Sequence, residues 1–102
     1  MLLKQKIERV RPAEFIAETT LIDAEENAMV MNRTFERCNS IFAAYKSLIL
    51  ALRNVSDCDV ELDSNHHQLK RELFGEKDEN TTLSNMLADV LAKNNINLIK
   101  KD

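Results

Sequence analysis

The sequence is poor in the residues that make tight turns. It contains one glycine and one proline among 102 residues, against typical shares of about 7% and 5%. An all-β fold needs such residues at its corners, so their scarcity favours helices. The charged and apolar fractions, 30% and 44%, are those of a folded domain. Composition therefore predicts an all-α protein.

Cysteine and long apolar runs are also scarce. Cys38 and Cys58 are too few for a disulfide scaffold. The N-terminal segment MLLKQKIERVR lacks the apolar stretch of an export signal. No run of residues approaches the length that crosses a bilayer. These absences predict a cytoplasmic protein without membrane association.

Motifs of catalysis are missing as well. There is no phosphate-binding glycine loop, no glycine-rich dinucleotide turn, no nucleophile elbow and no pair of carboxylates at a catalytic spacing. Glycine-dependent ligand loops need more than the single Gly75. We therefore predict that the chain is not an enzyme, with no catalytic residue, no cofactor and no metal.

One acidic segment has the spacing of a calcium loop. Oxygen-bearing side chains alternate there, at Asp57, Asp59, Glu61, Asp63 and Asn65, with Gln68 in the closing position. A calcium loop needs glycine where Leu62 stands and a bidentate glutamate where Gln68 stands. The neighbouring His66 and His67 point about 100° apart on a helix, so they do not share one metal. We interpret the segment as a solvated linker that caps a helix, with a metal sensor as the alternative.

The net charge of −3 is unevenly distributed. Residues 1–11 are basic, residues 12–32 are acidic, and residues 33–55 are basic again. The chain is accordingly divided into a basic N-terminal arm, residues 1–11, and a single helical domain, residues 12–102. The arm could contact nucleic acid or an acidic partner. Its candidate contact residues are Lys4, Lys6, Arg9 and Arg11.

The longest predicted element is a helix over about residues 13–54. Pro12 suits the first position of a helix, and no glycine or proline follows it before residue 54. Apolar residues recur at alternating spacings of four and three, the a/d pattern of a coiled coil. They are Ala17, Leu21, Ala24, Ala28, Met31, Phe35, Cys38, Phe42, Tyr45, Ile49 and Leu52.

Two shorter helices are predicted at about 64–74 and 82–93. Gly75 is expected to end the first in the left-handed conformation, and Asn94 with Asn95 to end the second. Ile96, Leu98 and Ile99 form an apolar tail that should pack back on the protein, because each exposed side chain would cost about 2 kcal/mol.

The length of the first helix predicts self-association. About 42 residues span roughly 63 Å, so the short helices cover only its C-terminal half. Residues 13–35 then need a second copy of the chain, a different protein, or a break near residues 19–27 that folds the helix back. The opposite charges of its halves favour an antiparallel homodimer. The expected interface residues are Phe15, Leu21, Ile22, Ala24, Ala28, Met31 and Phe35.

The functional prediction is a protein–protein interaction module. It would be a helical bundle, coiled-coil-like and completed by dimerisation, acting as an adaptor, chaperone, inhibitor or regulator. Its length and pattern resemble those of many small bacterial and phage accessory proteins, without the motif of any family. The alternative is a dimeric nucleic-acid-linked transcriptional regulator that uses the arm at residues 1–11.

Overall fold

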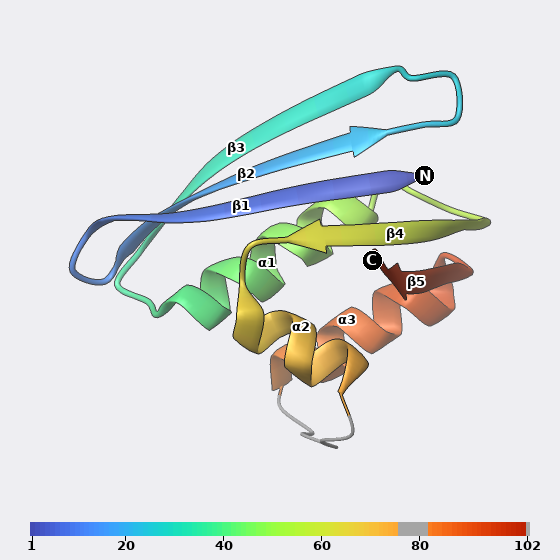
Figure 1. Cartoon of the computed structure of the whole chain (residues 1–102). Coiled ribbons are helices and arrows are strands. Elements are labelled where there is room, and N and C mark those ends of the chain that lie inside the picture. Colours follow the sequence, from blue (N-terminus) through green and yellow to red (C-terminus); the bar gives the residue numbers. More distant parts are fainter. Residues whose placement is uncertain (76–81, 102) are drawn as a thin grey trace.

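The computed structural model describes residues 1–75 and 82–101. It contains strands and helices in mixed order (Figure 1). They are β1 (Leu2–Arg11), β2 (Glu14–Ile22), β3 (Ala28–Glu36), α1 (Ser40–Leu52), β4 (Cys58–Ser64), α2 (His67–Phe74), α3 (Thr82–Lys93) and β5 (Ile96–Lys100). The fold is α/β, so the all-α prediction is wrong.

The predicted helix over residues 13–54 does not exist. Its residues form β2, β3 and α1, and only the last of these is helical. The turns before β2, between β2 and β3, and after β3 are made without glycine, because Ala13, Glu26 and Arg37 take left-handed backbone angles, with φ of 61°, 65° and 55°. Few residues other than glycine adopt this region. The scarcity of glycine was therefore a poor argument against strands in this chain.

The five strands of the described residues form one sheet in the order β3-β2-β1-β4-β5. β1, β2 and β3 pair antiparallel as a meander. β4 pairs parallel with β1, so that Gln5 lies opposite Ser64, and β5 pairs parallel with β4. Residues 1–11 are therefore not an arm, because Leu2–Arg11 forms the central strand of the sheet.

The helices cover one face of the sheet (Figure 1). α1 packs mainly on β2 and β1, while α3 packs on α1 and β5. Alternate strand residues point into this layer and are buried with the inner side of α1. The core includes Leu3, Ala17, Leu21, Tyr45, Leu48, Ile49, Leu52, Val60, Leu62, Leu69 and Leu87. Strand residues between these inward positions, such as Lys4, Glu18 and Asp63, point to the other face, which no described helix covers.

The two shorter helices were located well from the sequence. α3 spans the predicted residues 82–93, and α2 begins at His67 within the predicted 64–74. Asn95 is left-handed with φ of 54°, and Ile96 is buried at the start of β5. Gly75 ends α2 but is not left-handed, since its φ is −88°. It is needed because a Cβ there would collide with the carbonyl oxygen of Arg71.

Candidate functional site

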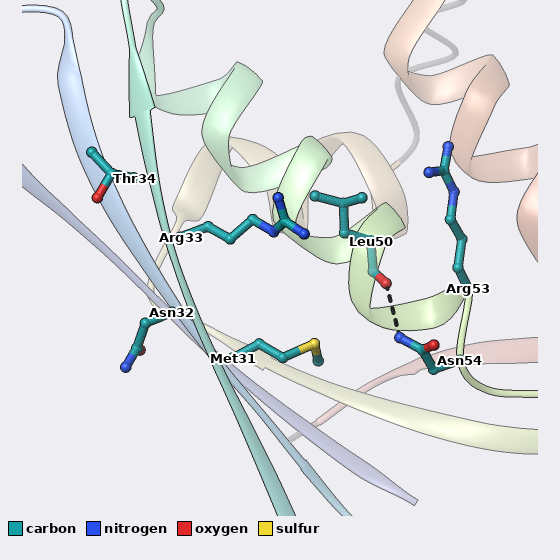
Figure 2. Close-up of a pocket in the computed structure, with 7 residues that line it drawn as sticks. All are labelled: Met31, Asn32, Arg33, Thr34, Leu50, Arg53 and Asn54. Atoms are coloured by element: carbon teal, nitrogen blue, oxygen red, sulfur yellow. Dashed lines mark hydrogen bonds between the residues drawn. The ribbon is translucent and has the colours of Figure 1, made fainter.

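A groove of about 650 Å³ separates β3 from α1 (Figure 2). Met31 and Arg33 point from β3 toward α1, whereas Asn32 and Thr34 point to the opposite side of the strand. This is the alternation expected along a strand. From α1 and its end, Leu50, Arg53 and Asn54 line the groove. In Figure 2 the Arg53 side chain extends on the side of Leu50 that is remote from β3.

The positions of the two arginines follow from local structure. Arg33 lies on β3, the edge strand of the sheet, where its side chain is exposed. Arg53 is the C-cap of α1, and its backbone N–H bonds the carbonyl oxygens of Ile49 and Ala51. A cation suits this negative end of the helix dipole. Leu50 lies between the two guanidinium groups in Figure 2.

The cationic surface continues beyond Arg53. A second hollow of about 430 Å³ shares Arg53 and is lined by Met86, Asp89, Val90, Lys93 and Asn94. Three cations, Arg33, Arg53 and Lys93, and one carboxylate, Asp89, therefore line the two hollows. We name the two hollows together the α1 groove. Within the described residues, none of its three cations makes an ion pair.

Another cationic hollow, of about 330 Å³, lies at the C-terminal end of α2. It is lined by His67, Lys70, Arg71, Phe74, Gly75 and Lys100. The sequence that follows Gly75 contains Glu76, Asp78 and Glu79, all of opposite charge. This hollow at the end of α2 is smaller than either hollow of the α1 groove. It is the competing candidate for a binding surface.

Three buried polar side chains meet where β1, β4 and α1 come together. Gln5, Ser47 and Ser64 are only 4%, 5% and 4% exposed. The Gln5 Nε2 donates to the carbonyl oxygen of Ala44 at 2.8 Å and to Ser47 Oγ at 2.9 Å. Ser64 Oγ donates to Gln5 Oε1 at 2.6 Å. We name Gln5, Ser47 and Ser64 the Gln5 centre.

The Gln5 centre is fully satisfied. Ser47 Oγ also donates to the Ala44 carbonyl oxygen at 3.1 Å, and the His66 backbone N–H donates to Ser64 Oγ at 3.1 Å. Among the described residues, every buried side-chain nitrogen and oxygen has a hydrogen-bond partner. Buried polar groups are tolerated in this way because each one left unpaired would cost about 1–3 kcal/mol.

His66 adjoins this centre and caps α2. Its Nδ1 accepts the backbone N–H of Leu69 at 3.1 Å, and its Nε2 lies 2.9 Å from Ser40 Oγ. Burial lowers the pKa of His66, and His67 lowers it further, while Glu72 opposes the shift. Because Nδ1 must be unprotonated to accept, this geometry requires the neutral ring.

The two cysteines are free thiols. Cys38 and Cys58 are both half-buried and make no disulfide. Burial raises the pKa of the Cys38 thiol. A raised pKa leaves less thiolate at neutral pH, so Cys38 is a weak nucleophile.

The predicted nucleic-acid contact residues lie outside the α1 groove. Lys4 and Lys6 point to the open face of the sheet, where Asp63 and Glu18 are their strand partners. Arg9 and Arg11 are exposed beside the turn between β1 and β2. The sequence did identify residues 33–55 as a basic segment, and this segment contains both Arg33 and Arg53. It missed Gln5, whose signal was a polar residue between the inward-facing Leu3 and Ile7 of β1.

The predicted interface residues do not form one surface. Phe15 and Leu21 are buried under the helices, and Ile22 is half-buried at the end of β2. Ala24 and Ala28 are exposed in and after the turn that follows. Met31 and Phe35 lie on the inner face of β3, where Phe35 packs edge-to-face on Phe42 at 6.3 Å.

The acidic segment resembling a calcium loop is largely strand β4. Its carboxylates Asp59, Glu61 and Asp63 alternate because they point to the open face, while Val60 and Leu62 point into the core. In the described part of the chain, no group of three or more His, Cys, Asp or Glu side chains is placed to hold a metal. None of the described helices has the length and apolarity to span a membrane.

Solved structures share this fold. The chain superimposes on the crystal structure of LC11-RNase H1 in complex with an RNA/DNA hybrid with a TM-score of 0.74 and 17% identity, over 98% of this chain and 83% of that one. It also superimposes on RNase H1 of the halophilic archaeon Halobacterium salinarum NRC-1 with a TM-score of 0.67 and 17% identity, over 99% and 86%. No family model and no curated protein sequence matches. At this identity the likeness establishes the fold.

These likenesses overturn the functional predictions. A helical bundle or coiled coil acting as adaptor, chaperone, inhibitor or regulator is wrong, because its helical seam is two strands and a turn. The alternative, a dimeric transcriptional regulator with a basic N-terminal arm, is wrong too, because the residues of that arm form strand β1. The prediction that the chain is not an enzyme is contradicted too, since both similar structures are RNase H1 proteins. The antiparallel homodimer depended on the absent long helix. Of the expected partners, nucleic acid is the one the likeness supports.

Proposed function

We propose that this protein binds double-helical nucleic acid, with an RNA/DNA hybrid as its first candidate ligand. The observation that carries the proposal is the α1 groove, which is lined by Arg33, Arg53 and Lys93, three cations that make no ion pair within the described residues. The solved structure with an RNA/DNA hybrid supports the same class of ligand. The ligand would lie along the side of α1 that faces β3 and α3.

The chemistry of the groove suits a phosphate backbone. Arginine donates two parallel hydrogen bonds to phosphate oxygens, and it keeps its charge at any physiological pH. Met31 and Leu50 line the same hollow and provide apolar contact for sugar carbons. A row of phosphate contacts positions a duplex without reading its sequence. We therefore expect binding that depends on charge and helix shape more than on base order.

The groove favours a duplex over a single strand. Proteins that hold single strands stack the bases on aromatic side chains, which contributes about 1–3 kcal/mol per base. No aromatic residue is among the described residues that line the α1 groove. Tyr45 and Phe15 are buried in the core. The bases of a single strand would thus find no stacking surface here.

A salt titration of hybrid binding tests the proposal. Fluorescence anisotropy would measure the affinity of the full chain for an RNA/DNA hybrid, the matching DNA and RNA duplexes, and a single strand. Three double variants remove two positive charges each from a different surface: Arg33→Gln with Arg53→Gln, Lys4→Gln with Lys6→Gln, and Lys70→Gln with Arg71→Gln. The last two are charge-matched controls on the open sheet face and the α2 end.

The three variants distinguish an error in the location of the binding surface from an error in the proposed function. Loss of a phosphate contact lowers the slope of log affinity against log salt by about one. Because Arg33→Gln with Arg53→Gln removes two such contacts, we expect its slope to fall by about two, with little change for the controls. A loss confined to Lys70→Gln with Arg71→Gln would move the site to the α2 end. Absence of salt-dependent binding to every duplex would refute the proposal.

The same samples should be assayed for cleavage, because the similar structures are RNase H1 proteins. Hybrid cleavage that co-purifies with the chain and is lost with the groove variant would add hydrolysis to binding.

The cytoplasmic location remains a prediction, which cell fractionation would test.

A further inference from the structure

The structure assigns the Gln5 centre the role of an uncharged hydrogen-bond network that connects β1, β4 and α1 and binds no divalent cation. Nucleases of many folds position Mg²⁺ or related ions with clustered carboxylates. In the described part of this chain, the place where buried polar side chains from β1, β4 and α1 meet contains an amide and two hydroxyls. The residues present do not fit such an ion. This inference concerns the centre itself and is independent of the proposed binding surface.

The oxygen that would ligate a cation is already occupied. Gln5 Oε1 is the only side-chain carbonyl oxygen of the centre, and the Ser64 hydroxyl donates to it at 2.6 Å. The amide nitrogen on the other branch carries two hydrogens, which point to the Ala44 carbonyl oxygen and to Ser47 Oγ. Amide hydrogens bear partial positive charge, so they repel a cation. Binding an ion would require breaking this network.

Charge compensation is missing as well. The centre is almost fully buried, and a divalent ion there would lose its hydration without gaining an anionic ligand. Asp63, next to Ser64 in sequence, points to the opposite face and lies 3.8 Å from Lys101 Nζ. Glu72 accepts hydrogen bonds from the Tyr45 hydroxyl at 3.0 Å and from Gln68 Nε2 at 2.9 Å. Both carboxylates thus have partners elsewhere.

The wild-type chain gives the direct test. The side-chain amide of Gln5 has its own signals in a ¹H–¹⁵N spectrum, and they should stay in place as Mg²⁺ is added to millimolar concentration. The thermal midpoint should be equally unaffected when Mn²⁺ replaces EDTA at constant ionic strength. Saturable movement of the Gln5 amide signals, or a rise of the midpoint that Gln5→Met abolishes, would overturn the inference.

A carboxylate introduced at the same place should create the missing site. Gln5→Glu nearly preserves shape and replaces the amide nitrogen with oxygen, so its midpoint should fall in EDTA and recover by several degrees with Mn²⁺. Ser64→Asp is the second variant if Gln5→Glu does not fold. Gln5→Met removes the network without adding charge, and Val30→Glu adds a carboxylate at an exposed position of β3. Neither should respond to Mn²⁺. If neither Gln5→Glu nor Ser64→Asp responds, the donor set is not what excludes the ion, and the inference fails.

Discussion

The hydroxyl of Ser64 donates a hydrogen bond of 2.6 Å to Oε1 of Gln5, a residue 59 positions earlier in the chain. The two residues are also strand partners, because β1 and β4 pair parallel at this point. Their side chains therefore connect the N-terminal strand with the middle of the chain inside the core. Ser47 of α1 completes the connection from the helical layer.

Breaking this network should destabilise the protein. Gln5→Met keeps the side-chain volume but leaves the Ser64 and Ser47 hydroxyls with one partner fewer in a buried site. We expect a loss of about 1–3 kcal/mol in the free energy of unfolding, measured by urea denaturation. Adding Ser64→Ala should cost less than its effect in the wild-type background, because the orphaned hydroxyl is then removed. Additive losses would show that the two side chains are not coupled.

Gly75→Ala should destabilise the chain although glycine is not left-handed there. In an unstrained position, this change would stabilise the protein by about 0.4–1 kcal/mol, because alanine lowers the conformational entropy of the unfolded chain. Here the new Cβ would collide with the carbonyl oxygen of Arg71, which is backbone. We expect a net loss of about 1–3 kcal/mol, read from the urea midpoint. A stabilised variant would mean that the end of α2 relaxes freely.

We expect the free energy of unfolding to fall as the pH is lowered, because His66 becomes protonated. Its folded pKa is lowered mainly by burial, so the unfolded state takes up the proton first. The neutral ring therefore stabilises fully above the ordinary value of 6.5, and this contribution is lost as the pH falls from there through the folded pKa. His66→Asn keeps a capping acceptor without this titration. Its unfolding free energy should vary less between pH 7 and pH 5 (approximate limits set by the histidine range) than that of wild type; equal slopes would assign the titration to another group.

Hybrid binding should not require a divalent cation. This prediction combines the α1 groove with the cation-free Gln5 centre. At matched ionic strength, the affinity for an RNA/DNA hybrid should be the same in EDTA and in Mg²⁺, because arginine contacts need no bridging ion. A requirement for Mg²⁺ in wild type, with the Gln5 amide signals still unmoved, would place the ion between groove and phosphate. No binding in either buffer would count against the groove alone.

The helix α3 near the C-terminus could be predicted from the sequence. The apolar spacing of residues 82–93 predicted α3, and the pair Asn94 and Asn95 predicted its end. The apolar tail after Asn95 became β5. The helix α3 and its end depend on neighbouring residues, so local patterns were sufficient to predict them, whereas the pairing of the tail with β4 as a strand was not predicted.

Residues 13–37 were misread because one spacing fits two structures. Positions four apart share a face in a helix, and they also share a face in a strand because four is even. Ala17 with Leu21, and Met31 with Phe35, satisfy both patterns. The intervening Ala24 lies in a turn. In β4 the strand signal was present, since Asp59, Glu61 and Asp63 alternate with Val60 and Leu62, but carboxylates at that spacing also resemble a calcium loop.

The sequence by itself determined the helical periodicity of α1 and α3, the basic character of residues 33–55 and the strand-like alternation of β4. Only the tertiary structure decided that Arg33 and Arg53 share one groove and that Gln5 meets Ser64. The physical reason is that strand pairing and layer packing join residues distant in the chain. The energy of each pairing depends on its partner, which no local pattern specifies.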